Sequence, residues 1–339
     1  MIISPQPKSN SRLLLTLIVL SASLVPAASH AQDYVVGRTV DGRPDLQGTW
    51  TNDTITPIER PIEMADQAFL TEDEIATAET TMAENRIAID NNVEVTAGAE
   101  DIGSYNEVWM DAGDTVLSTG QTSMITDPPN GRAPIRPEAE AIRDYAFAHL
   151  EDSWTYHSVW ERCITRGVPG SMLPAGYNNA YRFIQTKDTF TIIYEMIHYV
   201  RVIDLNKQEH NDSKVKLWMG DSVAHWEGDT LVIDTKNFND RGMLANSFAS
   251  GRLKGVPVSE ELHVVERFKR VSDDTVLWEA RVTDPVNLSA PFTISMPLTR
   301  DDEYTMYEYA CHEGNYAMEN ALSAGRIKEG KITSRFKTP

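Results

Sequence analysis

Alternation of apolar and polar residues dominates the second half of the chain and predicts antiparallel strands. Between Phe190 and Met196 every second residue is large and apolar, which is the period of a strand with one buried face. Further segments of this kind cover 214–219, 231–235, 261–271, 275–282, 292–298 and 304–310. Short polar turns rather than helical patterns separate them, so the segments predict a meander and not a parallel α/β sheet.

The region 32–150 has a different pattern, with two helical segments among irregular ones. Thr71 and Glu74 form a capping box, which predicts a polar helix that begins at Glu72 and runs to about Ala88. Pro137 marks the first turn of a second helix, and a short helix near 319–327 is expected to end the fold. Residues 90–135 show little periodicity, which is typical of long functional segments.

These elements together predict a mainly β protein. The antiparallel meander is expected to close into a barrel or a sandwich, because closure removes exposed strand edges. Gly48-Thr-Trp50 resembles the Gly-x-Trp sequence that opens the first strand of lipocalins, and this resemblance implies a calycin-like barrel with Trp50 at its floor. The helical and irregular segment 32–150 is expected to wrap the β-rich body 151–339 as one structural unit.

The N-terminus has the pattern of a secretory signal peptide over residues 1–31. Lys8 and Arg12 precede an uncharged apolar stretch from Leu13 to Val25, and small residues follow for cleavage near Ala31. This stretch is too short to span a bilayer comfortably. We therefore expect a periplasmic or secreted protein without stable membrane insertion.

The charge balance narrows the range of partners. The 339 residues include 31 Lys and Arg against 50 Asp and Glu, which gives a formal net charge of −19. Nucleic-acid binding depends on clustered positive charge, so no nucleic acid is expected and a small molecule is the expected partner. The oligomeric state is left open by the composition.

Cys163 and Cys311 are the only cysteines of the chain. Export to an oxidising compartment favours a disulfide between them, with two separate reduced thiols as the alternative. The bond would bring the polar loop 154–166 next to the segment 309–316. Two polar clusters that are far apart in the sequence would then be neighbours in space.

Ionisable and amide side chains near the strand ends and in this loop are the candidates for chemistry. Carboxylates and imidazoles transfer protons, so the catalytic candidates are Glu195, His198, His312 and His157. The candidates for substrate binding are Arg166, Tyr177, Asn178, Asn179, Arg201 and Glu313. The structural alternative is an internal Glu195–Arg201 pair, with the histidines and amides holding loops.

Motifs for cofactors and metals are missing from the sequence. It contains no Walker motif, no dinucleotide fingerprint, no H-E-x-x-H and no G-x-S-x-G, so no cofactor is expected. A metal site assembled from distant strands stays open, with His225, His263 or His312 and a carboxylate as ligands.

Several longer motifs point to a family. They are Pro44-Asp-Leu-Gln-Gly-Thr-Trp50, Glu161-Arg-Cys-Ile-Thr-Arg-Gly-Val-Pro-Gly170, Tyr177-Asn-Asn179, Tyr194-Glu-Met-Ile-His198, His225-Trp-Glu-Gly-Asp-Thr-Leu-Val-Ile-Asp234, His263-Val-Val-Glu-Arg-Phe268 and Tyr309-Ala-Cys-His-Glu-Gly-Asn-Tyr316. With these motifs the chain resembles a family of exported proteins from proteobacteria and acidobacteria. The resemblance implies export and a single structural unit, and it assigns no catalytic residue.

The expected function follows from the candidate residues and the expected barrel. It is a cofactor-independent lyase, isomerase or hydratase that acts by acid–base catalysis on a small, largely apolar molecule in the barrel cavity. Two alternatives stay open: a non-catalytic periplasmic carrier with the same cavity, and a metal-dependent hydrolase.

Overall fold

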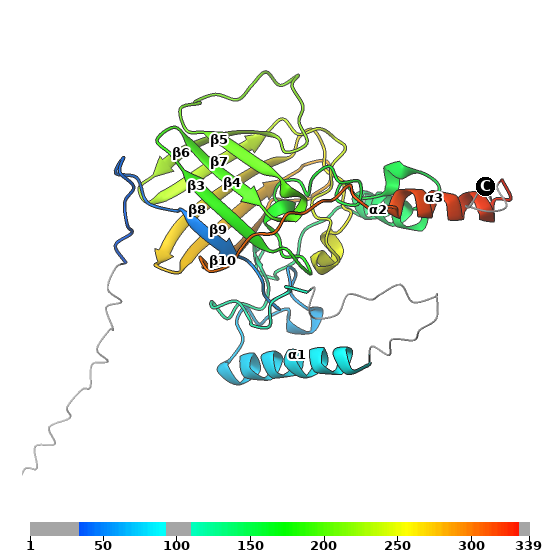
Figure 1. The fold of residues 1–339 in the computed structure, drawn as a ribbon, viewed down its shortest axis with the longest axis horizontal. Coiled ribbons are helices and arrows are strands. Elements are labelled where there is room, and N and C mark those ends of the chain that lie inside the picture. Colours follow the sequence, from blue (N-terminus) through cyan, green and yellow to red (C-terminus); the bar gives the residue numbers. More distant parts are fainter. Residues whose placement is uncertain (1–33, 93–109, 332–339) are drawn as a thin grey trace, which may run out of the picture. The chain divides into compact units, whose positions relative to one another are not determined.

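The alternating segments form one ten-stranded antiparallel sheet in the computed structural model, which describes residues 34–92 and 110–331 (Figure 1). The sheet curls into a nearly closed barrel with the strand order β5-β4-β3-β1-β10-β9-β8-β7-β6, and β2 pairs with β10. This confirms the mainly β prediction and, of its two forms, the barrel. The strands are β1 (Gly48–Thr51), β2 (Ile125–Asp127), β3 (Ala180–Gln185), β4 (Thr189–Tyr194), β5 (Val200–Asp204), β6 (Asp221–Glu227), β7 (Thr230–Lys236), β8 (His263–Ser272), β9 (Thr275–Thr283) and β10 (Phe292–Arg300).

Side chains bridge the one unsealed seam of the barrel, which lies between β5 and β6. The guanidinium of Arg201 on β5 donates to Ser222 Oγ on β6 at 3.0 Å and to Thr235 Oγ1 on β7 at 2.8 Å. It also forms a buried ion pair with Glu266 on β8, at 2.5 Å. Arg201 therefore pairs with Glu266 and not with Glu195, which corrects the internal pair considered from the sequence.

Large side chains fill the barrel interior. Phe183, Phe190 and Phe268 form an aromatic cluster with ring centroids 5.4 to 5.7 Å apart, and Trp50 contacts its edge at 6.3 Å. Trp50 and Trp278 are both completely buried. Since this packing occupies the centre that was expected to hold a ligand, the cavities described below are lined by loops, helices and strand ends.

In the described residues, three α-helices accompany the barrel: α1 (Glu72–Asn92), α2 (Pro137–Ala148) and α3 (Ala317–Lys328). The capping box is present, because Thr71 N–H donates to Glu74 Oε2 at 2.8 Å and Glu74 N–H donates to Thr71 Oγ1 at 3.3 Å. Pro137 is the first residue of α2, as its fixed φ favours. In the part of the chain that the structure describes, no helix is long and apolar enough to cross a membrane. The signal-peptide prediction for residues 1–31 lies outside the described residues.

Two of the predicted strands are wrong. The segment 214–219 contributes only an isolated bridge, between Leu217 and Phe238, as far as the described chain extends. The segment 304–310 has no strand partner among the residues that the structure describes, and it continues as an irregular stretch to 316, which we call the strap (residues 304–316). The strap bonds to side chains instead of a sheet edge, since Tyr307 N–H donates to Glu195.

Candidate functional site

The predicted disulfide joins the strap to the middle of the chain. Cys163 and Cys311 are bonded, which places the polar loop 154–166 beside the strap. Cys163 adopts φ 55°, a left-handed conformation that is uncommon outside glycine and is concentrated at functional sites. The disulfide therefore ties the second half of the strap to the polar loop.

Three carboxyl groups lie near the first residue of the strap, Tyr304, and we call Asp53, Asp111, Glu195 and Tyr304 the carboxyl centre. A cavity of about 130 Å³ opens between Asp53, Asp111 and the ring of Tyr304, with Thr49, Thr51 and Asp301 on its wall. The Tyr304 hydroxyl donates to the Glu195 carboxylate, with both oxygens at 3.0 Å. A space of this size accommodates the reacting group of a substrate, not a whole ligand.

Asp111 is the carboxyl group of the centre whose pKa is raised. Burial raises the pKa of its carboxyl to about 6, and the negative charges of Asp53 and Glu195 add to the shift, although a hydrogen bond from the Asn179 N–H opposes it. A carboxyl group with a pKa near the working pH both gives and accepts a proton readily. Asp111 is therefore the best acid–base group in this cavity.

Glu195 is held as a fixed hydrogen-bond acceptor. It follows β4, is 2% exposed, and accepts from the Tyr304 hydroxyl and from the Tyr307 N–H at 2.7 Å. Burial and the adjacent Glu195 raise the pKa of the Tyr304 phenol above its ordinary value, so Tyr304 keeps its proton and remains a donor. The strap thus supplies both donors that hold this carboxylate.

A tight turn after β4 separates Glu195 from the other residues of its predicted strand. Ile197 and His198 have φ values of 63° and 44°, and positive φ at a β-branched residue is a genuine outlier. The turn directs His198 to the strap, where its Nδ1 bonds to the Tyr309 carbonyl oxygen. Glu195 and His198 therefore both contact the strap, but His198 is exposed and lies outside the carboxyl centre.

The Tyr177-Asn178-Asn179 motif supports Asp111 and the strap. Asn179 is buried; its N–H donates to Asp111 Oδ2 at 3.3 Å and its side-chain amide donates to the Asp111 carbonyl oxygen. Tyr177 stacks on Tyr309 of the strap with ring centroids 6.3 Å apart. Asn178 turns the chain between them with φ 53°. Asn179 therefore holds Asp111 in its place through both its backbone and its side chain.

The other two histidine candidates, His157 and His312, lie outside the carboxyl centre. His157 is buried, its Nε2 bonds to the Leu150 carbonyl oxygen at 2.8 Å, and its Nδ1 lies 3.9 Å from the Glu161 carboxylate. His312 is exposed on the strap. Among the described residues, the hydrogen bonds and ion pairs of His157 are to nearby residues of the chain and do not include His312.

Of the remaining binding candidates, Glu313 lines a second hollow beside the disulfide, and Arg166 lies behind the Trp160 ring of the same hollow. A pocket of about 720 Å³ is lined by Trp160, Tyr177, Tyr309 and Glu313, which brings together residues of both polar segments. Arg166 is 3% exposed; it donates to the Leu173 carbonyl oxygen at 2.9 Å, and its guanidinium lies 5.7 Å from the centroid of the Trp160 ring. Burial lowers the pKa of this guanidinium below its ordinary value.

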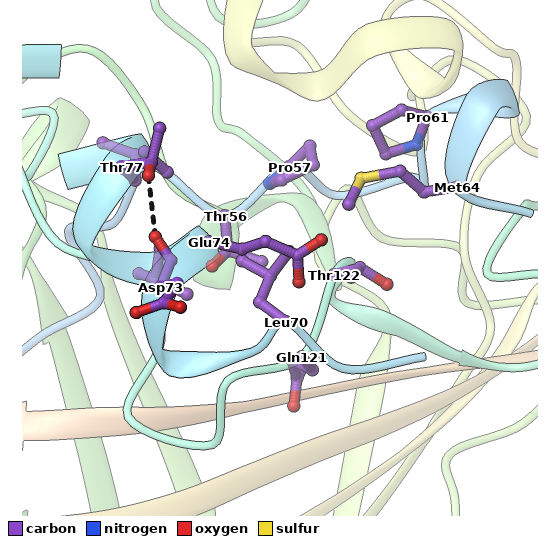
Figure 2. A pocket seen from close by; sticks show the side chains of 13 residues that line it. Thr56, Pro57, Pro61, Met64, Leu70, Asp73, Glu74, Thr77, Gln121 and Thr122 are labelled. Carbon is purple, nitrogen blue, oxygen red and sulfur yellow. Dashed lines mark hydrogen bonds between the residues drawn. The ribbon is translucent and has the colours of Figure 1, made fainter. Parts of the chain in front are cut away.

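A further pocket, of about 430 Å³, lies between α1 and the segment that precedes it. Figure 2 shows Pro57, Met64 and Leu70 around it, with the Thr77 hydroxyl bonded to the backbone of Asp73. The carboxylate of Glu74 is already occupied by the capping box and by Gln67 Nε2 at 2.7 Å. This pocket therefore offers apolar surface but no unoccupied chemical group at Glu74.

The histidines considered as metal ligands have other partners. His225 contacts Glu227 at 3.1 Å, and His263 contacts Asp234 at 2.7 Å. Over residues 34–92 and 110–331, no three His, Cys, Asp or Glu side chains are arranged to hold a metal ion.

No sequence pattern singles out Asp111 or Tyr304, although both line the small cavity. Asp111 belongs to the aperiodic region 90–135, whose lack of pattern did indicate a functional segment. Tyr304 belongs to a segment interpreted as a strand, and only its contact with Glu195 reveals its role. Comparison with protein-family models, curated proteins and solved structures finds no match to this chain.

Proposed function

We propose that the protein is an exported, cofactor-independent enzyme that transfers a proton at the carboxyl centre, as lyases, isomerases and hydratases do. The observation that carries the proposal is Asp111, a partly buried carboxyl group that faces a small cavity and has its pKa raised to about 6. Groups with such shifts are concentrated at catalytic sites. The three aspartates on the cavity wall favour a small polar or cationic reacting group over the apolar one first expected.

The roles of the residues follow from their contacts. Asp111 takes a proton from the substrate or returns one, because both of its protonation states are populated near pH 6. Glu195 stays in place through Tyr304 and Tyr307 and maintains the negative charge that raises the pKa of Asp111. Asn179 fixes the orientation of Asp111.

Proton exchange with solvent tests this proposal even while the substrate is unidentified. The wild-type protein is incubated with a small-molecule extract in D₂O, and mass spectrometry follows the extract. We expect one compound to gain deuterium or change mass, and Asp111→Asn to abolish the change because an amide does not transfer this proton. Asp114→Asn, an exposed carboxylate three residues away, is the matched control and should behave as wild type.

Two other outcomes would contradict the proposal that the protein is an enzyme with Asp111 as its acid–base group. If a compound is retained unchanged by wild-type protein and Asp111→Asn alike, the protein is a carrier. If Asp111→Asn converts a compound as fast as wild type does, the chemistry lies elsewhere.

Export is supported by the sequence of residues 1–31 and is compatible with the Cys163–Cys311 disulfide. The same preparation tests it, because protein purified from the periplasmic fraction should begin near Gln32. An intact N-terminus in a cytoplasmic fraction would reject export.

A further inference from the structure

Two arginines in the described part of the chain have neither a hydrogen-bond acceptor nor a carboxylate partner for their guanidinium groups. Over residues 34–92 and 110–331, every arginine except Arg162 and Arg241 donates a side-chain hydrogen bond or pairs with a carboxylate. Neither guanidinium forms an ion pair within these residues, although Asp240 lines the same cavity as both arginines. In a chain with a net charge of −19, two cations without a counter-ion are unexpected.

Both arginines line the same cavity, which has a volume of about 980 Å³. The loop 154–166 contributes Arg162 to this cavity, whereas it contributes Trp160 and Glu161 to the pocket beside the strap. Burial, together with the charge of Arg241, lowers the pKa of the Arg162 guanidinium. The cavity thus holds two like charges that repel each other.

Aromatic and apolar side chains make up most of the remaining wall. The Arg162 guanidinium lies 4.8 Å from the centroid of the Trp154 ring and 5.8 Å from that of Trp218, so the indoles hold it by cation–π contact. The apolar part of the wall includes Ile142, Tyr145, Met243 and Pro257. A cavity of this size with few polar groups is typical of small-molecule sites.

We propose that this cavity binds an organic anion with a planar apolar body, of the aromatic carboxylate class. The carboxylate lies between Arg162 and Arg241, where it removes their mutual repulsion and accepts hydrogen bonds from both guanidinium groups. The apolar body packs on Trp154, Tyr145 and Ile142. This site is separate from the carboxyl centre, and the proposal does not depend on the proposed function.

Calorimetric titration with three probes tests the ligand class: 2-naphthoate, the neutral 2-naphthylmethanol and inorganic phosphate. We expect 2-naphthoate to bind about tenfold more tightly than the alcohol, because only the acid meets the two charges. Phosphate alone should bind more weakly than 2-naphthoate, since it buries no apolar surface. Fluorescence of Trp154 and Trp218 should change on saturation with 2-naphthoate.

Two variants assign the binding to the arginines. Arg162→Gln and Arg241→Gln should each weaken 2-naphthoate by about three- to tenfold and leave 2-naphthylmethanol unchanged. Arg281→Gln, which removes an exposed arginine paired with Asp127 on the sheet, is the matched control and should not alter binding. Thermal midpoints show whether each variant is folded. If Arg162→Gln does not fold, the result with Arg241→Gln tests the proposal alone, because Arg241 is exposed and its replacement should not affect folding.

Three results would overturn the proposal. Equal affinities for 2-naphthoate and its alcohol would show an apolar cavity without anion recognition. Phosphate that binds as tightly as 2-naphthoate would show a site for inorganic anions only. Absence of 2-naphthoate binding would show that the two charges do not form a site of this class.

Discussion

Individual residues of this protein have roles that depend on partners far away in the chain. Arg201, at the seam of the barrel, and Glu195, at the end of β4, were considered as partners from the sequence, yet each has a different one. Arg201 bonds to Glu266 and Glu195 to the strap. Glu266 is completely buried and, among the described side chains, accepts one further hydrogen bond, from Trp278 Nε1 at 3.2 Å. Its charge is therefore compensated chiefly by Arg201.

Replacement of Arg201 should destabilise the folded protein. Arg201→Met leaves the Glu266 carboxylate buried without its cation, and we expect the free energy of unfolding to fall by about 3–5 kcal/mol. Arg267→Gln is the matched control, because it breaks the exposed pair with Glu227 and should cost less than about 1 kcal/mol. Urea unfolding measures both. Equal losses in the two variants would show that the seam does not depend on the buried pair.

At the level of elements, local patterns predicted those parts of the fold that are set by neighbours in sequence. The capping box located α1, Pro137 located α2, and alternation located β4 and β7 to β10. The segment 304–310 alternates as well. A strand also needs a neighbouring strand with which to pair, and the sequence of the segment alone does not show whether one is available. The same holds for the candidate site: the sequence indicates the disulfide, which the structure contains, whereas the interactions of Asp111 and Tyr304 with Glu195 arise only on folding.

The strap should depend on Glu195 for its local stability. The Tyr307 amide and the Tyr304 hydroxyl both donate to this carboxylate, so Glu195→Ala should speed hydrogen exchange of the Tyr307 amide by roughly tenfold or more, because the strap loses both bonds. Glu195→Gln keeps an acceptor oxygen and serves as the control. The Phe268 amide in β8 reports on the barrel and should exchange equally in all three proteins. Unchanged exchange at Tyr307 in Glu195→Ala would mean that the strap is held by other contacts.

The molecule as a whole combines a tightly packed barrel with a carboxyl centre whose negative charges destabilise the folded state. Large aromatic side chains fill the interior, while Asp111 lies partly buried beside two other carboxylates. Ionised Asp111 is less stable in the folded chain than in the unfolded chain, and proteins commonly give up stability in this way at functional sites. The carboxyl centre should therefore be visible in the stability of the entire protein.

The pH dependence of unfolding, compared between wild type and Asp111→Asn, measures the cost of this buried charge. The pKa of Asp111 rises from 3.8 to about 6 on folding, so between these values the folded state binds more protons and wild type loses stability as pH increases. Asp111→Asn lacks this loss, and Asp114→Asn retains it. We predict that the free energy of unfolding of Asp111→Asn, relative to that of wild type, increases from about pH 4 to pH 7. At pH 8 Asp111→Asn should still be the more stable protein. A wild-type protein that is as stable as Asp111→Asn at pH 8, with no change in their difference from pH 4, would contradict the assignment of Asp111 as a destabilised acid–base group.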